Sequence, residues 1–252
     1  MTVAAARILR NGTVCFVGIG LPSAAANLAR LTHAPDAVLI YESGTIGTKP
    51  NVLPLSIGDG ELAETADTVV SVPEIFRYWL QAGRVDVGFL GAAQIDKLGN
   101  LNTTVIGGSY CAPRIRLPGA GGAPEIASAA KEVALILKQS PRTFVEKLDF
   151  VTSSGYVDLS GQQGAPATRG RGPTVVITDL GIMNSDPVSR ELVLTSLHPG
   201  VTLEQVRSAT GWPLKVAPKL EVTPRPTAVE LTALRDLHAR TAAAHGTAPQ
   251  GE

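Results

Sequence analysis

The ten residues Val38-Leu39-Ile40-Tyr41-Glu42-Ser43-Gly44-Thr45-Ile46-Gly47 are the most informative part of this chain. Residues 38–41 are apolar and favour β structure, which predicts a buried strand. The strand ends at Glu42, and the glycines behind it allow a sharp turn and the close approach of another molecule. Because ligands bind at the carboxyl ends of strands in open α/β sheets, Glu42 is a candidate nucleophile, general base or metal ligand. A loop residue that caps a turn is the alternative.

Length and composition indicate a globular protein without an affinity for polyanions. The chain has 252 residues, of which 44% are hydrophobic and 17% are charged. It can bury a sizeable core, and we expect a single domain over residues 1–252, with two small domains as the alternative. Since 22 basic residues balance 22 acidic ones, we expect neither nucleic acid nor a membrane surface as a partner. The N-terminus lacks a signal-peptide pattern, and glycines and a proline interrupt the uncharged stretch 11–29.

Cysteine and histidine usage points away from disulfides and metals. Cys15 and Cys111 show no CxxC spacing, so we expect two reduced thiols in a cytoplasmic protein. The four histidines are scattered without the spacing of metal ligands, and no metal is expected.

Apolar runs typical of strands alternate with segments of helical character. Strands are predicted at 13–17, 38–41, 68–71, 85–90, 101–107, 133–137, 174–178 and 191–196. Helices are predicted at 2–10, 24–31, 73–81, 124–130, 202–211 and 227–245. This alternation favours an α/β fold with a mainly parallel sheet flanked by helices. We also expect a long loop at 48–60, a turn at 184–187, an exposed excursion at 158–173 and a frayed tail at 246–252.

Two glycine-rich loops accompany this pattern. The first, Gly18-Ile19-Gly20-Leu21-Pro22-Ser23, follows a strand as a dinucleotide-binding loop would, but Ser23 stands where the third glycine of GxGxxG belongs. A nucleotide-cofactor site is therefore disfavoured. The second, Gly119-Ala120-Gly121-Gly122, precedes a predicted helix, and its backbone N–H groups are candidates for holding an oxyanion. A plain tight turn is the alternative.

The order of the segments Gly18–Pro22, Glu42–Gly47, Gly91–Asn102 and Gly119–Gly122 resembles the β subunits of family I CoA-transferases. The resemblance covers nearly the whole chain, and the pairing of Glu-Ser-Gly with Gly-x-Gly-Gly-Ala is fairly specific to the family. It implies the CoA-transferase or NagB-like form of the α/β fold. Within the family, segments 14–22, 55–67, 75–81 and 195–201 are most similar to the branch that acts on 3-oxoadipate.

The resemblance implies that Glu42 is the catalytic nucleophile. In such ping-pong covalent catalysis, Glu42 takes up CoA from succinyl-CoA as a glutamyl-CoA thioester and passes it to an acceptor acid. The resemblance also places Gly121 and Gly122 in the oxyanion loop. Further positions expected to bind substrate or CoA are Gly18, Gly20, Ser43, Gly44, Asn102 and Gly119.

The same resemblance implies partners and substrates. The active site of the family lies between an α and a β subunit, so we expect an α2β2 or larger hetero-oligomer with no resident cofactor. The expected acceptor is 3-oxoadipate, in aromatic-compound catabolism by the β-ketoadipate pathway. Glutaconate or another dicarboxylate is the alternative acceptor. An effector-binding or isomerase-like domain of the same fold is the alternative outside transfer, with Lys49, Arg114 and Arg116 as the cations nearest the glycine loops.

The remaining candidate side chains have structural roles as alternatives to functional ones. Ser43 lacks an evident His/Asp partner, which disfavours a serine hydrolase. Cys111 is more simply an idle thiol than a reactive one. Asn102 has a structural turn role as its alternative to substrate binding, while Asp59 and Glu61 are expected to cap a loop or face solvent.

Overall fold

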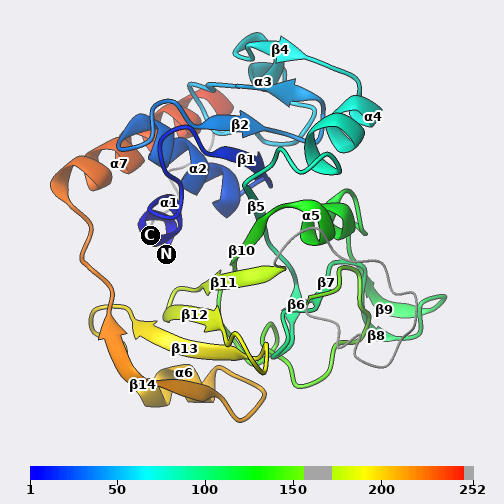
Figure 1. Cartoon of the computed structure of the whole chain (residues 1–252), viewed down its shortest axis with the longest axis vertical. Helices are drawn as coiled ribbons and strands as arrows, with labels where there is room; N and C mark the ends of the chain where they lie inside the picture. The colour runs from blue at the N-terminus through cyan, green and yellow to red at the C-terminus, as the bar shows by residue number, and fades with distance from the viewer. Residues whose placement is uncertain (156–171, 247–252) are drawn as a thin grey trace. The chain divides into compact units, whose positions relative to one another are not determined.

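The computed structural model describes residues 1–155 and 172–246 (Figure 1). The chain forms two compact units. The first unit contains Thr2–Phe89 and the described residues from Arg225 onward, and the second contains Leu90–Pro224. The expectation of one domain over 1–252 remains a prediction.

The first unit is built on parallel strands. Its strands lie in the order β5-β1-β2-β3-β4. Their bounds are β1 Val14–Val17, β2 Val38–Ile40, β3 Thr45–Ile46, β4 Thr68–Val69 and β5 Val87–Leu90. The central strand β1 is paired in parallel with β2 on one side and β5 on the other, whereas β3 and β4 add antiparallel strands at one edge. From β1 the chain continues to β2 on one side, and it later adds β5 on the other side of β1. Open α/β sheets bind ligands at such a reversal of strand order.

Helices cover this sheet. They are α1 Thr2–Ala6, α2 Leu21–Leu31, α3 Gly60–Glu64, α4 Val72–Glu74, η1 Ile75–Leu80 and α7 Ala228–His245. Helix α2 is rich in alanine and buries residues 22–29, which lets it pack closely against its neighbours. The helix expected at 73–81 is instead one α-helical turn followed by the π-helix η1. Ile75 and Leu80 are five residues apart and both fully buried, a spacing that the wider π turn brings onto one face.

The second unit carries its own five strands, drawn in Figure 1 as arrows that run from green (β10) through yellow to orange (β14). Their order is β14-β13-β12-β11-β10. The bounds are β10 Glu132–Ile136, β11 Pro173–Ile177, β12 Gly181–Ser185, β13 Leu192–Leu197 and β14 Lys215–Val222. The two outer pairs are parallel and the two inner pairs are antiparallel. Two short hairpins and two helices complete the unit: β6 Gln94–Ile95 with β7 Leu101–Asn102, β8 Val105–Gly108 with β9 Pro113–Arg116, α5 Ala123–Ala129 and α6 Leu203–Ser208.

The α/β class is confirmed, with parallel pairing around β1 and helices against the sheet; antiparallel strands lie at the edge of the first unit and within the second. Among the described residues no helix has the length and apolar character needed to cross a membrane.

Several boundaries differ from the sequence prediction. The turn expected at 184–187 is wrong at its start, because Asn184 and Ser185 belong to β12 and pair with β13. The reversal comes at Asp186–Arg190, where Asp186 accepts hydrogen bonds from the N–H groups of Val188 and Ser189. The helix expected at 2–10 ends at Ala6. Most of the excursion at 158–173 and the tail after Gly246 lie outside the described residues.

A partly buried ion pair joins the two ends of the first unit. Arg7, just behind α1, donates from Nε and Nη2 to the two carboxylate oxygens of Glu230 in α7, each at 2.7 Å. Thr227 adds hydrogen bonds from its N–H and its hydroxyl group. The hydrogen bonds from Arg7, supported by Thr227, lower the pKa of Glu230 to about 2. Glu230 is 8% exposed, so this charge is well shielded from water.

We predict that Glu230→Gln lowers the free energy of unfolding at pH 7 by about 1–3 kcal/mol, because it removes charge-assisted hydrogen bonds. A carboxylate with a lowered pKa stabilises the fold above its ordinary pKa of 4.5, and this contribution is lost as the pH falls towards 2. The difference between wild type and variant in urea denaturation should therefore shrink as the pH is lowered through that window. Glu64→Gln, at an exposed position of α3, is the matched control and should change little. A difference that stays constant with pH would contradict the role of the ion pair.

Candidate functional site

Glu42 lies in a tight turn that joins β2 to β3. The N–H of Gly44 donates to the C=O of Tyr41 at 3.0 Å, and the N–H of Tyr41 donates to the C=O of Thr45 at 3.1 Å. Behind the turn, Ile40 pairs with Ile46 in an antiparallel ladder. These bonds place Glu42 and its neighbour Ser43 at the tip of a hairpin, just past the carboxyl end of a central parallel strand.

The conformation of Gly44 requires glycine. Its φ is +101°, a region that L side chains rarely adopt. A Cβ atom at this position would lie 2.0 Å from the carbonyl oxygen of Val70. The close approach is part of the structure, because the N–H of Val70 donates to the C=O of Gly44 at 2.9 Å. The glycine of the Glu-Ser-Gly motif therefore serves the backbone of the turn.

Tyr41 connects the turn to helix α2 through its side chain. Its side chain is fully buried, and its hydroxyl group lies 2.7 Å from Oγ of Ser23 and 3.4 Å from Nδ2 of Asn27, both on α2. Burial raises the pKa of Tyr41 to about 12, so the phenol stays protonated and can donate. The residue beside Glu42 is thus fixed to a helix through its side chain and to the hairpin through its backbone. This support could not be predicted from the sequence, because nothing in the spacing of Ser23, Asn27 and Tyr41 indicates it.

The parallel register brings the first glycine loop level with Glu42. Phe16 of β1 pairs with Ile40 of β2, so Gly18 and Glu42 both lie two residues beyond a paired position. A Cβ on Gly18 would lie 3.0 Å from the carbonyl oxygen of Phe89, and Gly20 has a φ of +85° where α2 begins. Within the first unit, the structure therefore gathers five predicted site residues at one edge of the sheet: Gly18, Gly20, Glu42, Ser43 and Gly44.

The carboxylate of Glu42 is available for chemistry. Glu42 is half-buried and makes no hydrogen bond or ion pair with any residue in the described parts of the chain. Ser43 differs, since its Oγ is buried and has no hydrogen-bond partner among the same residues. A carboxylate with free lone pairs on a rigid turn can act as a nucleophile or a base.

The second predicted loop belongs to the second unit. The N–H of Gly119 donates to the C=O of Thr103 at 2.9 Å, and the hydroxyl group of Thr103 donates back to the C=O of Gly119 at 2.7 Å. Gly121, with a φ of +49°, and Gly122 follow directly before α5. Within residues 1–155 and 172–246 their N–H groups donate to no acceptor. Two unpaired N–H groups on a loop fixed at Gly119 are what an oxyanion site needs.

Asn102, a predicted site residue, uses its side-chain amide in hydrogen bonds within the protein. It is fully buried, and its amide nitrogen donates to Gln94 at 2.8 Å and to the C=O of Val105 at 2.6 Å. Its oxygen accepts from the N–H groups of Thr104 and Val105. The geometry favours the structural turn role that was its alternative, while its role in substrate binding remains a prediction.

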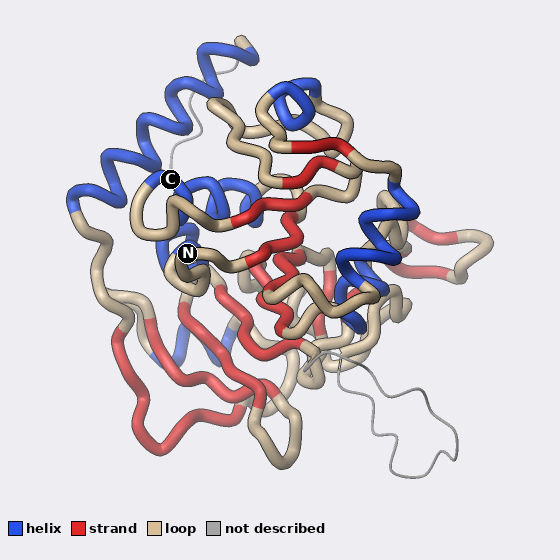
Figure 2. Tube along the Cα trace, turned by 45° about the horizontal axis from the view of Figure 1, so that its top comes forward, coloured by secondary structure: helices blue, strands red, loops and turns tan. Residues whose placement is uncertain are grey.

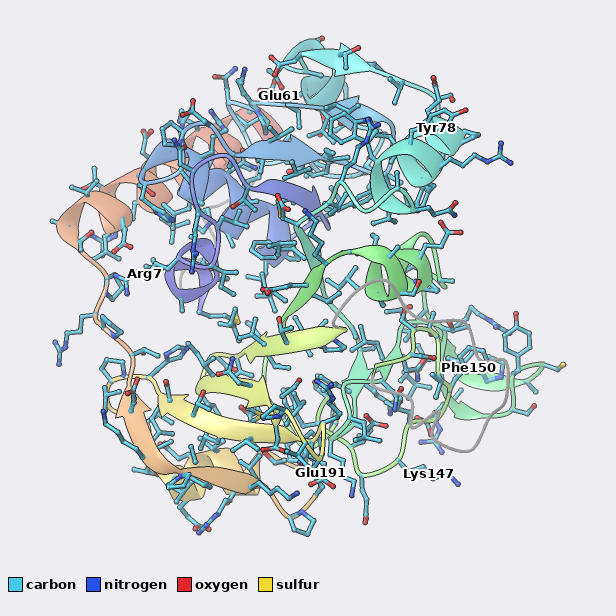
Figure 3. All side chains as sticks on the ribbon, viewed as in Figure 1. Arg7, Glu61, Tyr78, Lys147, Phe150 and Glu191 are labelled. Atoms are coloured by element: carbon cyan, nitrogen blue, oxygen red, sulfur yellow. The ribbon has the colours of Figure 1, made fainter. Side chains whose placement is uncertain are left out.

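The cysteines and the potential metal ligands of the described residues form no second candidate site. Cys15 is buried, which raises the pKa of its thiol, and Cys111 is exposed; both are free. No group of three or more potential metal-ligating His, Cys, Asp or Glu side chains occurs in the part of the chain that the structure describes. Figure 3 draws the side chains as sticks and labels four of the charged ones: Arg7, Glu61, Lys147 and Glu191. A depression lined by β12, β13 and β14 contains none of the predicted site residues.

We predict that Gly44→Ala lowers the free energy of unfolding by more than about 2 kcal/mol, because it adds a clash with Val70 to the cost of a positive φ. The matched control is Gly12→Ala, where φ is +76° and nothing lies within 4 Å of the added Cβ. That control should cost about 1 kcal/mol from backbone strain alone. Chemical denaturation measures both, and equal losses would contradict the close approach at Gly44.

Comparisons with known proteins show which family this chain belongs to. The family model for coenzyme A transferase matches residues 1–209. The chain is 67% identical to a subunit of the 3-oxoadipate CoA-transferase of Pseudomonas knackmussii, covering 98% of this chain and 94% of that protein. It is 35% identical to a subunit of the glutaconate CoA-transferase of Acidaminococcus fermentans, over 91% and 88% of the two chains. The crystal structure of glutaconate coenzyme A-transferase from that organism superimposes with a TM-score of 0.84 at 32% identity, over 93% and 91%. The chain belongs to the coenzyme A transferase family.

Proposed function

We propose that this chain is the β subunit of a CoA-transferase that moves CoA from succinyl-CoA to 3-oxoadipate. The observation that carries the proposal is Glu42, a free carboxylate on a rigid turn, in a chain 67% identical to a protein named as a subunit of 3-oxoadipate CoA-transferase. Moving CoA between two acids is close to thermoneutral only if the thioester is never hydrolysed. The reaction therefore needs a carboxylate nucleophile and not an activated water.

The proposed steps balance without a redox partner or an added acid. Glu42 attacks the thioester carbonyl of succinyl-CoA, forming a mixed anhydride and releasing the CoA thiolate. The thiolate attacks the Glu42 carbonyl, which releases succinate and leaves a glutamyl-CoA thioester. The acceptor acid then reverses both steps and leaves as its CoA thioester, so Glu42 is regenerated.

Each tetrahedral intermediate carries a negative oxygen. We assign its stabilisation to the N–H groups of Gly121 and Gly122, where the loss of one such donor typically costs about 10²–10³ in rate. Remaining contacts to the substrate and CoA are assigned to Gly18, Gly20, Ser43, Gly44, Asn102 and Gly119. Contacts to the CoA carrier, far from the reacting carbonyl, supply binding energy that is used at the reacting centre.

We also propose a partner subunit, a compartment and a pathway for this reaction. The chain acts with a separate α subunit, because the relative from Pseudomonas knackmussii is named as one subunit of its enzyme. We place the two subunits in an α2β2 or larger complex. It uses CoA as a substrate and needs no resident cofactor. We place it in the cytoplasm, in aromatic-compound catabolism through the β-ketoadipate pathway.

A second candidate acceptor is glutaconate, favoured by the 35% identical relative that acts on it by name. Both acceptors are dicarboxylic acids and need the same chemistry at Glu42. The difference in identity between the two relatives favours 3-oxoadipate. A non-transferase role as an effector-binding or isomerase-like domain leaves the free carboxylate of Glu42 without a purpose.

The test uses the chain co-expressed with its α subunit and purified as a complex. Succinyl-CoA should support CoA transfer to 3-oxoadipate faster than to glutaconate. Glu42→Gln keeps the size of the side chain but removes the nucleophile, and should lower transfer by a factor on the order of 10³ or more. Glu64→Gln is the control and should transfer normally.

A preference for glutaconate would keep the mechanism and overturn the acceptor. Undiminished transfer by Glu42→Gln would overturn the nucleophile.

A further inference from the structure

The hairpin of β8 and β9 exposes much of its surface in the second unit. Figure 2 shows it as two strands that project from the body of the unit. All but the first residue of β9 are exposed, and Tyr110 and Ile115 expose 56% and 50% of their surface. The described residues therefore leave two large side chains of this hairpin, Tyr110 and Ile115, open to solvent.

Tyr110 is held in place by an arginine and a second aromatic ring. The guanidinium carbon of Arg116 lies 4.9 Å from the centre of the Tyr110 ring, and Nη2 of Arg116 donates to the C=O of Tyr110 at 2.6 Å. The ring of Phe150, labelled in Figure 3, lies 5.5 Å from that of Tyr110, centre to centre. The cation–π contact and the paired rings orient Tyr110 although it is largely exposed.

The hairpin carries positive charge without compensation. Between Asp96 and Glu125 the sequence contains no acidic residue, whereas β9 contributes Arg114 and Arg116. Neither guanidinium group forms an ion pair with any carboxylate of the described residues. Two guanidinium groups beside an oriented aromatic ring suit a ligand that combines several negative charges with a flat ring.

We propose that the β8–β9 hairpin binds the adenosine phosphate end of CoA. The part of the Tyr110 ring that Arg116 and Phe150 leave exposed contacts adenine, and Arg114 and Arg116 pair with the phosphate groups. This assignment rests on the proposed function, which makes CoA a substrate, and it names the part of the chain that holds the carrier.

The position of the hairpin along the chain agrees with an elongated ligand. β9 leads directly into the Gly119–Gly122 loop, and the N–H of Leu117 donates to the C=O of Thr104 at 3.0 Å at the base of the hairpin. Gly121 is five positions after Arg116, a span of at most about 17 Å when extended. The pantetheine arm likewise holds the nucleotide of CoA away from the thioester. One end of the ligand then lies at the loop and the other along the hairpin.

The kinetic test compares succinyl-CoA with succinyl-pantetheine, which lacks the nucleotide. For the double variant Arg114→Ala/Arg116→Ala in the αβ complex, we expect KM for succinyl-CoA to rise about tenfold or more, with KM for succinyl-pantetheine unchanged. Arg142→Ala, exposed in the same unit, is the control and should change neither KM. An equal rise for both substrates, an unchanged KM for succinyl-CoA, or loss of the α subunit from the complex would overturn the proposal.

A binding test is independent of transfer. Cys111 lies on the exposed loop of the hairpin, whereas Cys15 is buried, so alkylation of this chain should occur at Cys111. Adenosine 3′,5′-bisphosphate, which has no thiol, should slow the alkylation of Cys111 by iodoacetamide in a saturable manner. The protection should be lost in the double variant.

Absence of protection in the wild-type complex would overturn the nucleotide site. Protection in a complex that transfers no CoA would support the site and overturn the proposed function alone.

Discussion

The turn from Tyr41 to Gly44 is the constraint on which the candidate site depends. Two backbone hydrogen bonds close it, and the positive φ of Gly44 lets the backbone of Val70 lie against it. With a Cβ at Gly44 the two backbones would have to separate, and β4 would lose its contact with the hairpin. The rigid turn holds a carboxylate at its tip while leaving the oxygens free. A nucleophile needs both properties, because disorder lowers the chance of attack and a hydrogen-bonded partner lowers reactivity.

Burial around the turn explains why the site is rigid. Tyr41 reaches α2 through Ser23 and Asn27, and α2 is fully buried over most of its length. A buried phenol that is hydrogen-bonded costs little, whereas the same phenol without its partners would be unfavourable. The sheet, the helix and the turn therefore support one another, so the position of Glu42 follows from packing far from its carboxylate. In the second unit, the reciprocal bonds between Thr103 and Gly119 hold the glycine loop in a comparable way.

The parts of this protein that follow local rules were predictable, and the parts that depend on distant contacts were not. The strand before Glu42 and the glycine loop before α5 follow from hydrophobic runs and glycine positions, and both are confirmed. The short strand β3 was missed, because two residues carry no periodic pattern and are a strand only through pairing with Ile40. Strand β14 was missed for a related reason, since its mixed charged and proline-containing sequence gains its order from β13. Sequence alone placed Glu42 at a strand end, but neither the hairpin nor the Tyr41 anchor that fixes it.

The central claim is that Glu42 carries CoA covalently, and the most direct measurement is the mass of this chain after reaction. The αβ complex would be mixed with succinyl-CoA without an acceptor, then quenched and digested. A glutamyl-CoA thioester predicts a mass increase equal to CoA minus water on the peptide that contains Glu42. The increase should disappear when 3-oxoadipate is added and be absent in Glu42→Gln. Transfer to 3-oxoadipate with an unmodified chain, or the added mass on another residue such as Ser43, would contradict it.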